Sequence, residues 1–128
     1  MQAIVATALG RVEIDLESEE AELVDGDGPT AAAVEVSLPL LVAADKVGSR
    51  VVALVARRPP LVISDDAGLT WREAGGGLPA GTAIAIDADD PDRLLFASEA
   101  RVFLSEDGGR FWRGLAPELI GITAVAFS

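Results

Sequence analysis

The chain contains no cysteine, no histidine and no tyrosine. Without cysteine it can form neither a disulfide framework nor a thiolate metal site. Without histidine it lacks the commonest general base and the usual ligand of zinc and iron. These absences exclude Ser-His-Asp and Cys-His catalysis, zinc-dependent hydrolysis and catalysis by a tyrosine nucleophile. We expect no metal site and no cofactor.

Positive charge is also scarce, since 10 Lys and Arg stand against 21 Asp and Glu, for a net charge of -11. Nucleic acid and anionic membranes both attract basic surfaces, which this composition disfavours. No apolar run approaches the roughly 18 residues of a transmembrane helix. The first residues lack the basic segment of a secretory signal. We therefore expect a cytoplasmic protein that binds neither nucleic acid nor membrane.

A repeat of 41 residues organises the second half of the chain. Residues 53–87 align without a gap on residues 94–128, with eleven identical pairs, among them Trp71 and Trp112. Apolar residues replace one another at most of the other positions. A four-stranded β-propeller blade has about 40–45 residues, which fits this period. The alternative, an ordinary β-sandwich, does not account for the repeat.

Alternating apolar residues and clusters of Gly and Pro predict an all-β chain. The expected strands lie near residues 2–7, 11–15, 20–24, 32–37, 51–56, 60–64, 70–74, 82–87, 93–98, 101–105, 111–114 and 122–128. We group them into three four-stranded β-propeller blades within a single domain, 1–128. The first blade takes the strands of 2–24, a worn copy of the repeat. The second spans about 32–74 and the third about 82–114.

Two turn motifs occur one repeat apart, each between the third and fourth strands of a blade. The first reads S-x-D-x-G-x-T-W from Ser64 to Trp71, and the second has Phe111 in place of Thr. Both resemble the Asp-box, or BNR repeat, of sialidases, related glycosidases and plant-type photosystem assembly factors. The resemblance covers residues 50–128 well and residues 1–49 poorly.

We interpret the motif residues as structural: Ser64, Asp66, Gly68 and Trp71 in one copy, Ser105, Asp107, Gly109 and Trp112 in the other. The Asp can accept hydrogen bonds from N–H groups of its own turn, and the Gly permits a positive φ. The Trp covers the apolar layer of the blade. The resemblance implies that such turns lie on the face opposite a catalytic site.

Acidic residues replace or follow these motifs elsewhere. The first blade carries Glu17, Glu19 and Glu22 where the others have Asp, Gly and Trp, so its hairpin must be held differently. A second acidic stretch comprises Asp87, Asp89, Asp90 and Asp92. Its spacing lacks the Gly and the distal Glu of a calcium-binding loop, and we expect a solvated turn.

Three blades cannot close a ring, so we expect a partner. Closure removes exposed strand edges, and propellers close with four or more blades. Residues 122–128 of a second copy could pair with residues 2–7 and complete the first blade by strand exchange. A two-fold homodimer of this kind forms a six-bladed ring. A nine-bladed trimer and a fragment of a longer chain are the alternatives.

We favour a non-catalytic scaffold or binding module of unknown ligand, for which an anionic small molecule, a glycan and a protein are the classes left open. The candidate binding residues are Arg11, Arg57, Arg58 and Arg101. They fall between second and third strands, on the face where propeller sites usually open, and arginine suits the recognition of anions.

The alternative is a glycoside hydrolase-like enzyme that uses paired carboxylates. The carboxylates on the same face are Asp25, Asp27, Glu99 and Glu118. The resemblance to sialidases implies a tyrosine nucleophile and an arginine clamp. Because the chain has no tyrosine, a Tyr-dependent sialidase is excluded.

Overall fold

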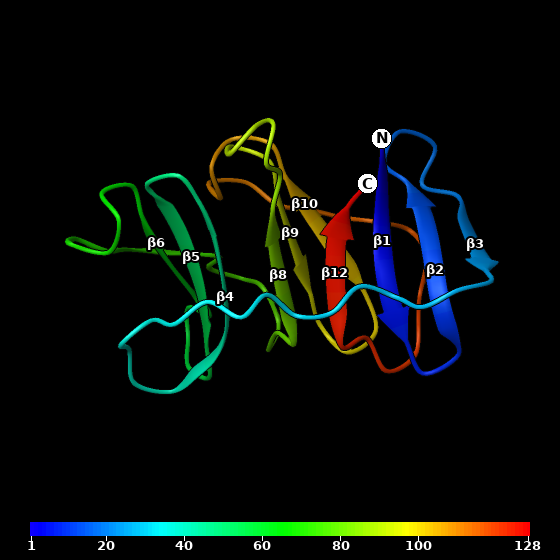
Figure 1. The fold of residues 1–128 in the computed structure, drawn as a ribbon, viewed down its shortest axis with the longest axis horizontal. Coiled ribbons are helices and arrows are strands. Elements are labelled where there is room, and N and C mark those ends of the chain that lie inside the picture. Colours follow the sequence, from blue (N-terminus) through cyan, green and yellow to red (C-terminus); the bar gives the residue numbers. More distant parts are fainter.

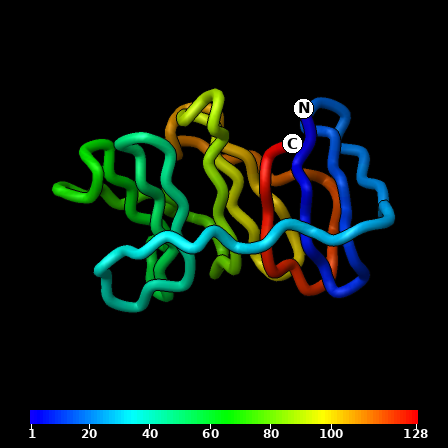
Figure 2. Tube along the Cα trace, viewed as in Figure 1, coloured from blue at the N-terminus to red at the C-terminus, as the bar shows by residue number.

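The computed structural model describes residues 1–128, which form twelve β-strands and no helix, as Figure 1 and Figure 2 show. The strands are β1 (Gln2–Thr7), β2 (Gly10–Asp15), β3 (Ala21–Val24), β4 (Leu41–Val47), β5 (Arg50–Val55), β6 (Leu61–Ser64), β7 (Arg72–Ala74), β8 (Ala83–Ile86), β9 (Leu94–Ala97), β10 (Val102–Ser105), β11 (Arg113–Gly114) and β12 (Ala124–Phe127). The chain has no helix that could span a membrane.

The strands form three four-stranded antiparallel sheets. Sheet A has the order β12-β1-β2-β3, sheet B the order β4-β5-β6-β7 and sheet C the order β8-β9-β10-β11. The predicted all-β class and the grouping of strands in fours are confirmed. The repeat also has a structural meaning, because β8 and β12, one period apart, are the first strands of sheets C and A.

Sheet C lies between sheets B and A (Figure 1). Because successive side chains of a strand point to opposite faces, β9 contributes to two separate cores. Its Leu95 and Ala97 belong to the apolar cluster shared with sheet A. Its Leu94 and Phe96 belong to the cluster shared with sheet B. All four side chains are 0% exposed, which explains why this strand is apolar on both faces.

The last strand completes the first sheet within one chain. β12 pairs antiparallel with β1, with Ala3 opposite Phe127 and Ala6 opposite Ala124. The prediction that residues 122–128 of a second copy fill this place by strand exchange is therefore wrong. It assumed that the sheets follow one another in space in chain order, whereas the order in the row is B, C, A, so sheet C delivers β12 directly to sheet A.

Residues 25–40, which we call the strap, connect sheet A to sheet B across the whole row (Figure 1). The strap crosses sheet A where Gly28 lies against Ala6, so closely that a Cβ on Gly28 would be 2.7 Å from the Ala6 Cβ. It then passes in front of β12, β8 and β4 before it turns back into β4 (Figure 2).

The strand predicted at 32–37 lies inside the strap, and the first strand of sheet B is β4 instead, so this prediction is wrong. The backbone of the strap forms no ladder, and β4 takes the place beside β5 that the prediction gave to residues 32–37. The alternating pattern is nevertheless used. Val34, Val36 and Leu38 pack on the outward face of sheet B, while Glu35 and Ser37 are exposed.

The strap therefore covers the outward face of sheet B, at one end of the row. The buried residues beneath it are Ala44, Ala53, Val55 and Val62, with Trp71 packed beside them. β5 thus has one face against sheet C and the other against the strap, which accounts for the fully buried run from Val51 to Val55.

Replacement of Val36 by Asp should lower the free energy of unfolding by about 2 kcal/mol, because it places a carboxylate against the apolar face of sheet B. Urea denaturation followed by the fluorescence of Trp71 and Trp112 would measure the change. Ser37→Asp is the matched control, since it adds the same charge at an exposed neighbouring position, with an expected effect within about 0.5 kcal/mol. Equal losses in the two variants would contradict the packing of the strap.

Candidate functional site

The four candidate arginines lie at or beside the hairpins that join β1 to β2, β5 to β6 and β9 to β10, and these hairpins are at the same end of the three sheets (Figure 1). Three of them form ion pairs with nearby glutamates: Arg11 with Glu13 at 2.9 Å, Arg57 with Glu73 at 2.9 Å and Arg101 with Glu118 at 3.2 Å. Arg58 is exposed and has no ion-pair partner. The arginines therefore do not present four free charges to a ligand.

One cavity at this end contains two of the arginines. Its volume is about 220 Å³, and it lies between sheet B and the segment that leads to β8. The lining residues are Val42, Val55, Ala56, Arg57, Arg58, Pro60, Leu78, Pro79, Ala80 and Gly81. Arg57 and Arg58 thus stand beside an apolar surface, whereas Arg11 and Arg101 do not line this cavity.

The first motif turn is held by a closed set of hydrogen bonds around Asp66. The Ser64 hydroxyl donates to Asp66 Oδ1 at 2.7 Å and accepts from the Gly68 N–H at 2.8 Å. The Thr70 hydroxyl donates to Asp66 Oδ2 at 2.6 Å, and the Thr70 N–H donates to Oδ1 at 2.8 Å. These bonds, led by that of the Thr70 hydroxyl, lower the pKa of Asp66 from 3.8 to about 2.

The second turn repeats this arrangement with the Arg110 N–H, at 3.1 Å from Asp107 Oδ1, in place of the threonine hydroxyl. Ser105 donates to Asp107 Oδ1 at 2.9 Å, and the Phe111 N–H donates to the same oxygen at 3.0 Å. Phe111 stands where the first turn has Thr70, so no hydroxyl reaches the second carboxylate oxygen. The N–H of Phe111 is the main cause that lowers the pKa of Asp107.

The glycines of the turns adopt a backbone conformation that other residues disfavour, and the tryptophans pack beside the turns. Gly68 and Gly109 adopt φ values of 95° and 89°, in the region that favours glycine. The Trp112 indole N–H donates to Gly109 O at 3.0 Å, and its ring meets Phe96 edge-on at 6.0 Å between centroids. Both turns lie toward the end of the sheets opposite the arginines (Figure 1).

Sheet A has a substitute for the motif that the sequence did not reveal. Asp15 Oδ1 accepts hydrogen bonds from the N–H groups of Ser18, at 2.9 Å, and Glu17, at 2.8 Å. These bonds lower the pKa of Asp15. Glu19 of the same hairpin accepts from Arg113 at 2.6 Å, which ties sheet A to sheet C. An Asp at the end of a strand followed by small or polar residues is the signal that could have identified this turn.

Sheets B and C are joined at the same end. Arg50 donates to Pro91 O at 2.7 Å and pairs with Asp65, and Arg72 donates to Gly108 O at 2.7 Å. Each arginine leaves sheet B and reaches a turn of sheet C. The motif turns are therefore part of the contact between neighbouring sheets, which is a structural role.

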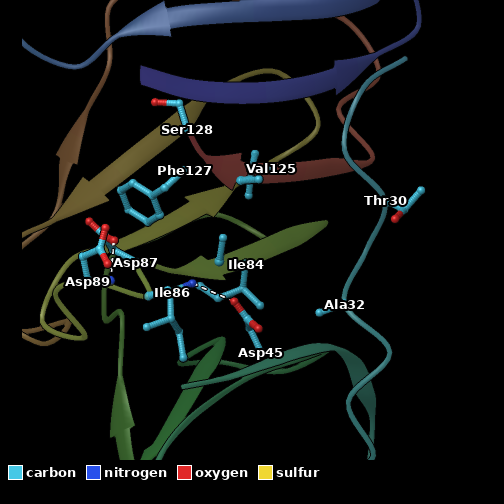
Figure 3. A pocket seen from close by; sticks show the side chains of 13 residues that line it. Thr30, Ala32, Asp45, Ile84, Ile86, Asp87, Asp89, Val125, Phe127 and Ser128 are labelled. Atoms are coloured by element: carbon cyan, nitrogen blue, oxygen red, sulfur yellow. Dashed lines mark hydrogen bonds between the residues drawn. The ribbon is translucent and has the colours of Figure 1, made fainter. Parts of the chain in front are cut away.

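A second cavity, of about 270 Å³, lies under the strap, against β8 and β12 (Figure 3). Asp45, Asp87 and Asp89 are among its lining residues. The predicted solvated turn is confirmed for Asp89, Asp90 and Asp92, which are exposed, but it is wrong for Asp87, which is only 3% exposed. The local sequence resembles a polar turn, but packing against residues distant in the chain buries this side chain.

No model of a known protein family matches the chain, and no curated protein sequence does so either. The resemblance to the Asp-box family consequently rests on the residues of the two turns alone and stays a prediction.

Thr70→Val should raise the pKa of Asp66 toward 3.8, because it removes the hydroxyl that contributes most to the lowered value. Because the pKa of Asp66 is lower in the folded chain than in the unfolded chain, the charged carboxylate stabilises the folded state at pH values above the unfolded-state pKa. This contribution to stability is lost as the pH falls toward 2. The variant should therefore lose less stability on acidification. NMR titration of the Asp66 carboxyl group would measure the shift.

Thr70→Ser keeps the hydroxyl and is the matched control, with an unchanged pKa expected for Asp66. Conversely, Phe111→Thr introduces a hydroxyl at the exposed position beside Asp107 and should lower the pKa of that residue further. A pKa of Asp66 that does not respond to Thr70→Val would contradict the assignment.

Proposed function

We propose that this protein is a non-catalytic binding module built as half of an Asp-box β-propeller. Three observations support the propeller: the repeat, the two motif turns and the adjacency of β4, β8 and β12, the first strands of the three sheets. In propellers the blades surround a central channel. Fold alone does not determine function, so the ligand must be argued from a site.

The observation that carries the proposal is the cavity of about 220 Å³ beside Arg57 and Arg58. Arg58 has no ion-pair partner, and a guanidinium group suits a carboxylate or another oxyanion. Arg57 adds positive charge to the same lining, although it is paired with Glu73. The apolar lining, which includes Val55 and Leu78, suits a hydrocarbon part. We infer that the ligand is an amphipathic organic anion, either a free molecule or a group carried by a glycan or a protein.

Binding is favoured over hydrolysis by the surroundings of the carboxylates on this face. Glu118 forms an ion pair with Arg101 at 3.2 Å. Asp25, Asp27, Glu99 and Glu118 are all exposed, whereas a general acid of a glycosidase needs a setting that raises its pKa. The glycoside hydrolase-like alternative predicts turnover of a glycoside panel that is lost when one of these residues becomes an amide.

Arg58→Ala should weaken the binding of 3-phenylpropionate about tenfold, because it removes a charge-assisted hydrogen bond. Isothermal titration calorimetry would measure the affinity, with 3-phenylpropanamide as the neutral ligand that should bind worse to the unmodified protein. Arg101→Ala is the control, since it removes the same charge from the same end but away from the cavity. If both variants weakened the binding of 3-phenylpropionate equally, the effect would come from the overall charge of this end of the protein, and the proposed site would be contradicted.

The homodimer stays a prediction, without strand exchange as its cause. A dimer can form through either outward face of the row. The outward face of sheet B is covered by the strap, and the outward face of sheet A presents Arg11, Glu13 and Glu22. A dimer predicts a solution mass of about twice 13.2 kDa by light scattering at micromolar concentration. A species of 13.2 kDa would exclude it.

A further inference from the structure

The cavity under the strap differs in chemistry from the arginine cavity. Its walls come from β8, from β12 and from the strap, and Asp45 of β4 lies at one side (Figure 3). The lining residues are Thr30, Ala32, Asp45, Ile84, Ala85, Ile86, Asp87, Ala88, Asp89, Val125, Ala126, Phe127 and Ser128. None of them is Lys or Arg, so three carboxylates face no cation from the lining.

Asp87 is the carboxylate with unused bonding capacity. Its Oδ1 accepts from the Asp89 N–H at 2.9 Å, whereas its Oδ2 is buried without any hydrogen-bond partner. Asp45, in contrast, accepts from the Ile86 N–H and the Lys46 N–H, each at 2.8 Å. A buried carboxylate oxygen without a donor is costly, and a cationic donor that binds beside it removes this cost.

We propose that this cavity binds a primary alkylammonium group through Asp87. A hard metal ion requires several oxygen ligands, and no three acidic side chains are arranged to supply them. An alkylammonium group instead needs one or two acceptors together with apolar walls, which Ile84 and Val125 provide. The shared chemistry fits both a free aliphatic amine and the side chain of a lysine in another protein.

Phe127 has two roles in this site. Its ring lies beside the Asp87 carboxyl group at one end of the cavity (Figure 3). Asp87 Oδ2 is covered, so binding requires a neighbouring side chain to move, and we assign this movement to the half-buried Phe127 beside it. The face of the ring then offers the cation a second favourable contact.

The test uses the full chain and two probes, n-pentylamine and Nα-acetyl-lysine methylamide, with n-pentanol as the neutral counterpart of the amine. Titrations followed by NMR should give saturable shifts of the Ile84 and Val125 methyl signals with an amine and none with n-pentanol. Binding of the free amine alone points to a small-molecule ligand, and binding of the lysine derivative alone points to a protein ligand. Binding of neither probe overturns the proposal.

Asp87→Asn should weaken the binding of the responding amine at least about tenfold, because the amide keeps the bond from the Asp89 N–H but loses the charge. Asp89→Asn is the matched control, since it removes one charge from the same turn and should change the affinity less than about threefold. Equal losses, or a loss of thermal stability in Asp87→Asn with unchanged affinity, would assign Asp87 a purely structural role and overturn the site. Arg58→Ala should leave this affinity unchanged, which separates the two cavities.

Discussion

The pairing of β12 with β1 is the constraint on which the rest of the structure depends. It places the last strand of the chain in the first sheet and so fixes the order of the row as B, C, A. The chain leaves sheet A after β3 and must travel the full width of the molecule before sheet B can begin. The strap exists because of this distance, and its path past the first strands creates the cavity beneath it.

The strap also covers a face that the end of the row would otherwise expose. Blade-like sheets that end a row expose one face, and exposed apolar faces are a liability. At sheet B the strap covers this face with Val34, Val36 and Leu38. At sheet A the outward face is charged instead, with Glu13 opposite Glu22 in the ladder. The outward face of sheet B is thus protected from water by the strap, whereas the outward face of sheet A carries charged residues that water can solvate.

Local features of the fold could be predicted from the sequence, and long-range ones could not. Alternation located eleven of the twelve strands, and the S-x-D-x-G pattern located the two turns, because these depend on neighbouring residues. The strand predicted at 32–37 failed because alternation signals a half-buried extended segment but not its hydrogen-bond partner. The predictions for the partner of β12 and for the exposure of Asp87 were wrong for a related reason, since both features depend on residues far away in the chain.

The distribution of charge distinguishes the two cavities from the rest of the surface. With 21 acidic and 10 basic residues, most carboxylates can remain in water without a partner, and most arginines find a glutamate or an aspartate nearby. Among the residues that line the two cavities, two depart from this pattern: Arg58, a cation without an ion pair, and Asp87, a buried carboxylate with a free oxygen. A charged group without a partner indicates a binding site more strongly when it lines a cavity than when it lies on an open surface. In a cavity, a ligand can supply the missing partner while it displaces water. The two departures have opposite signs and lie toward opposite ends of the sheets, so one molecule could hold an anion at one end and a cation at the other.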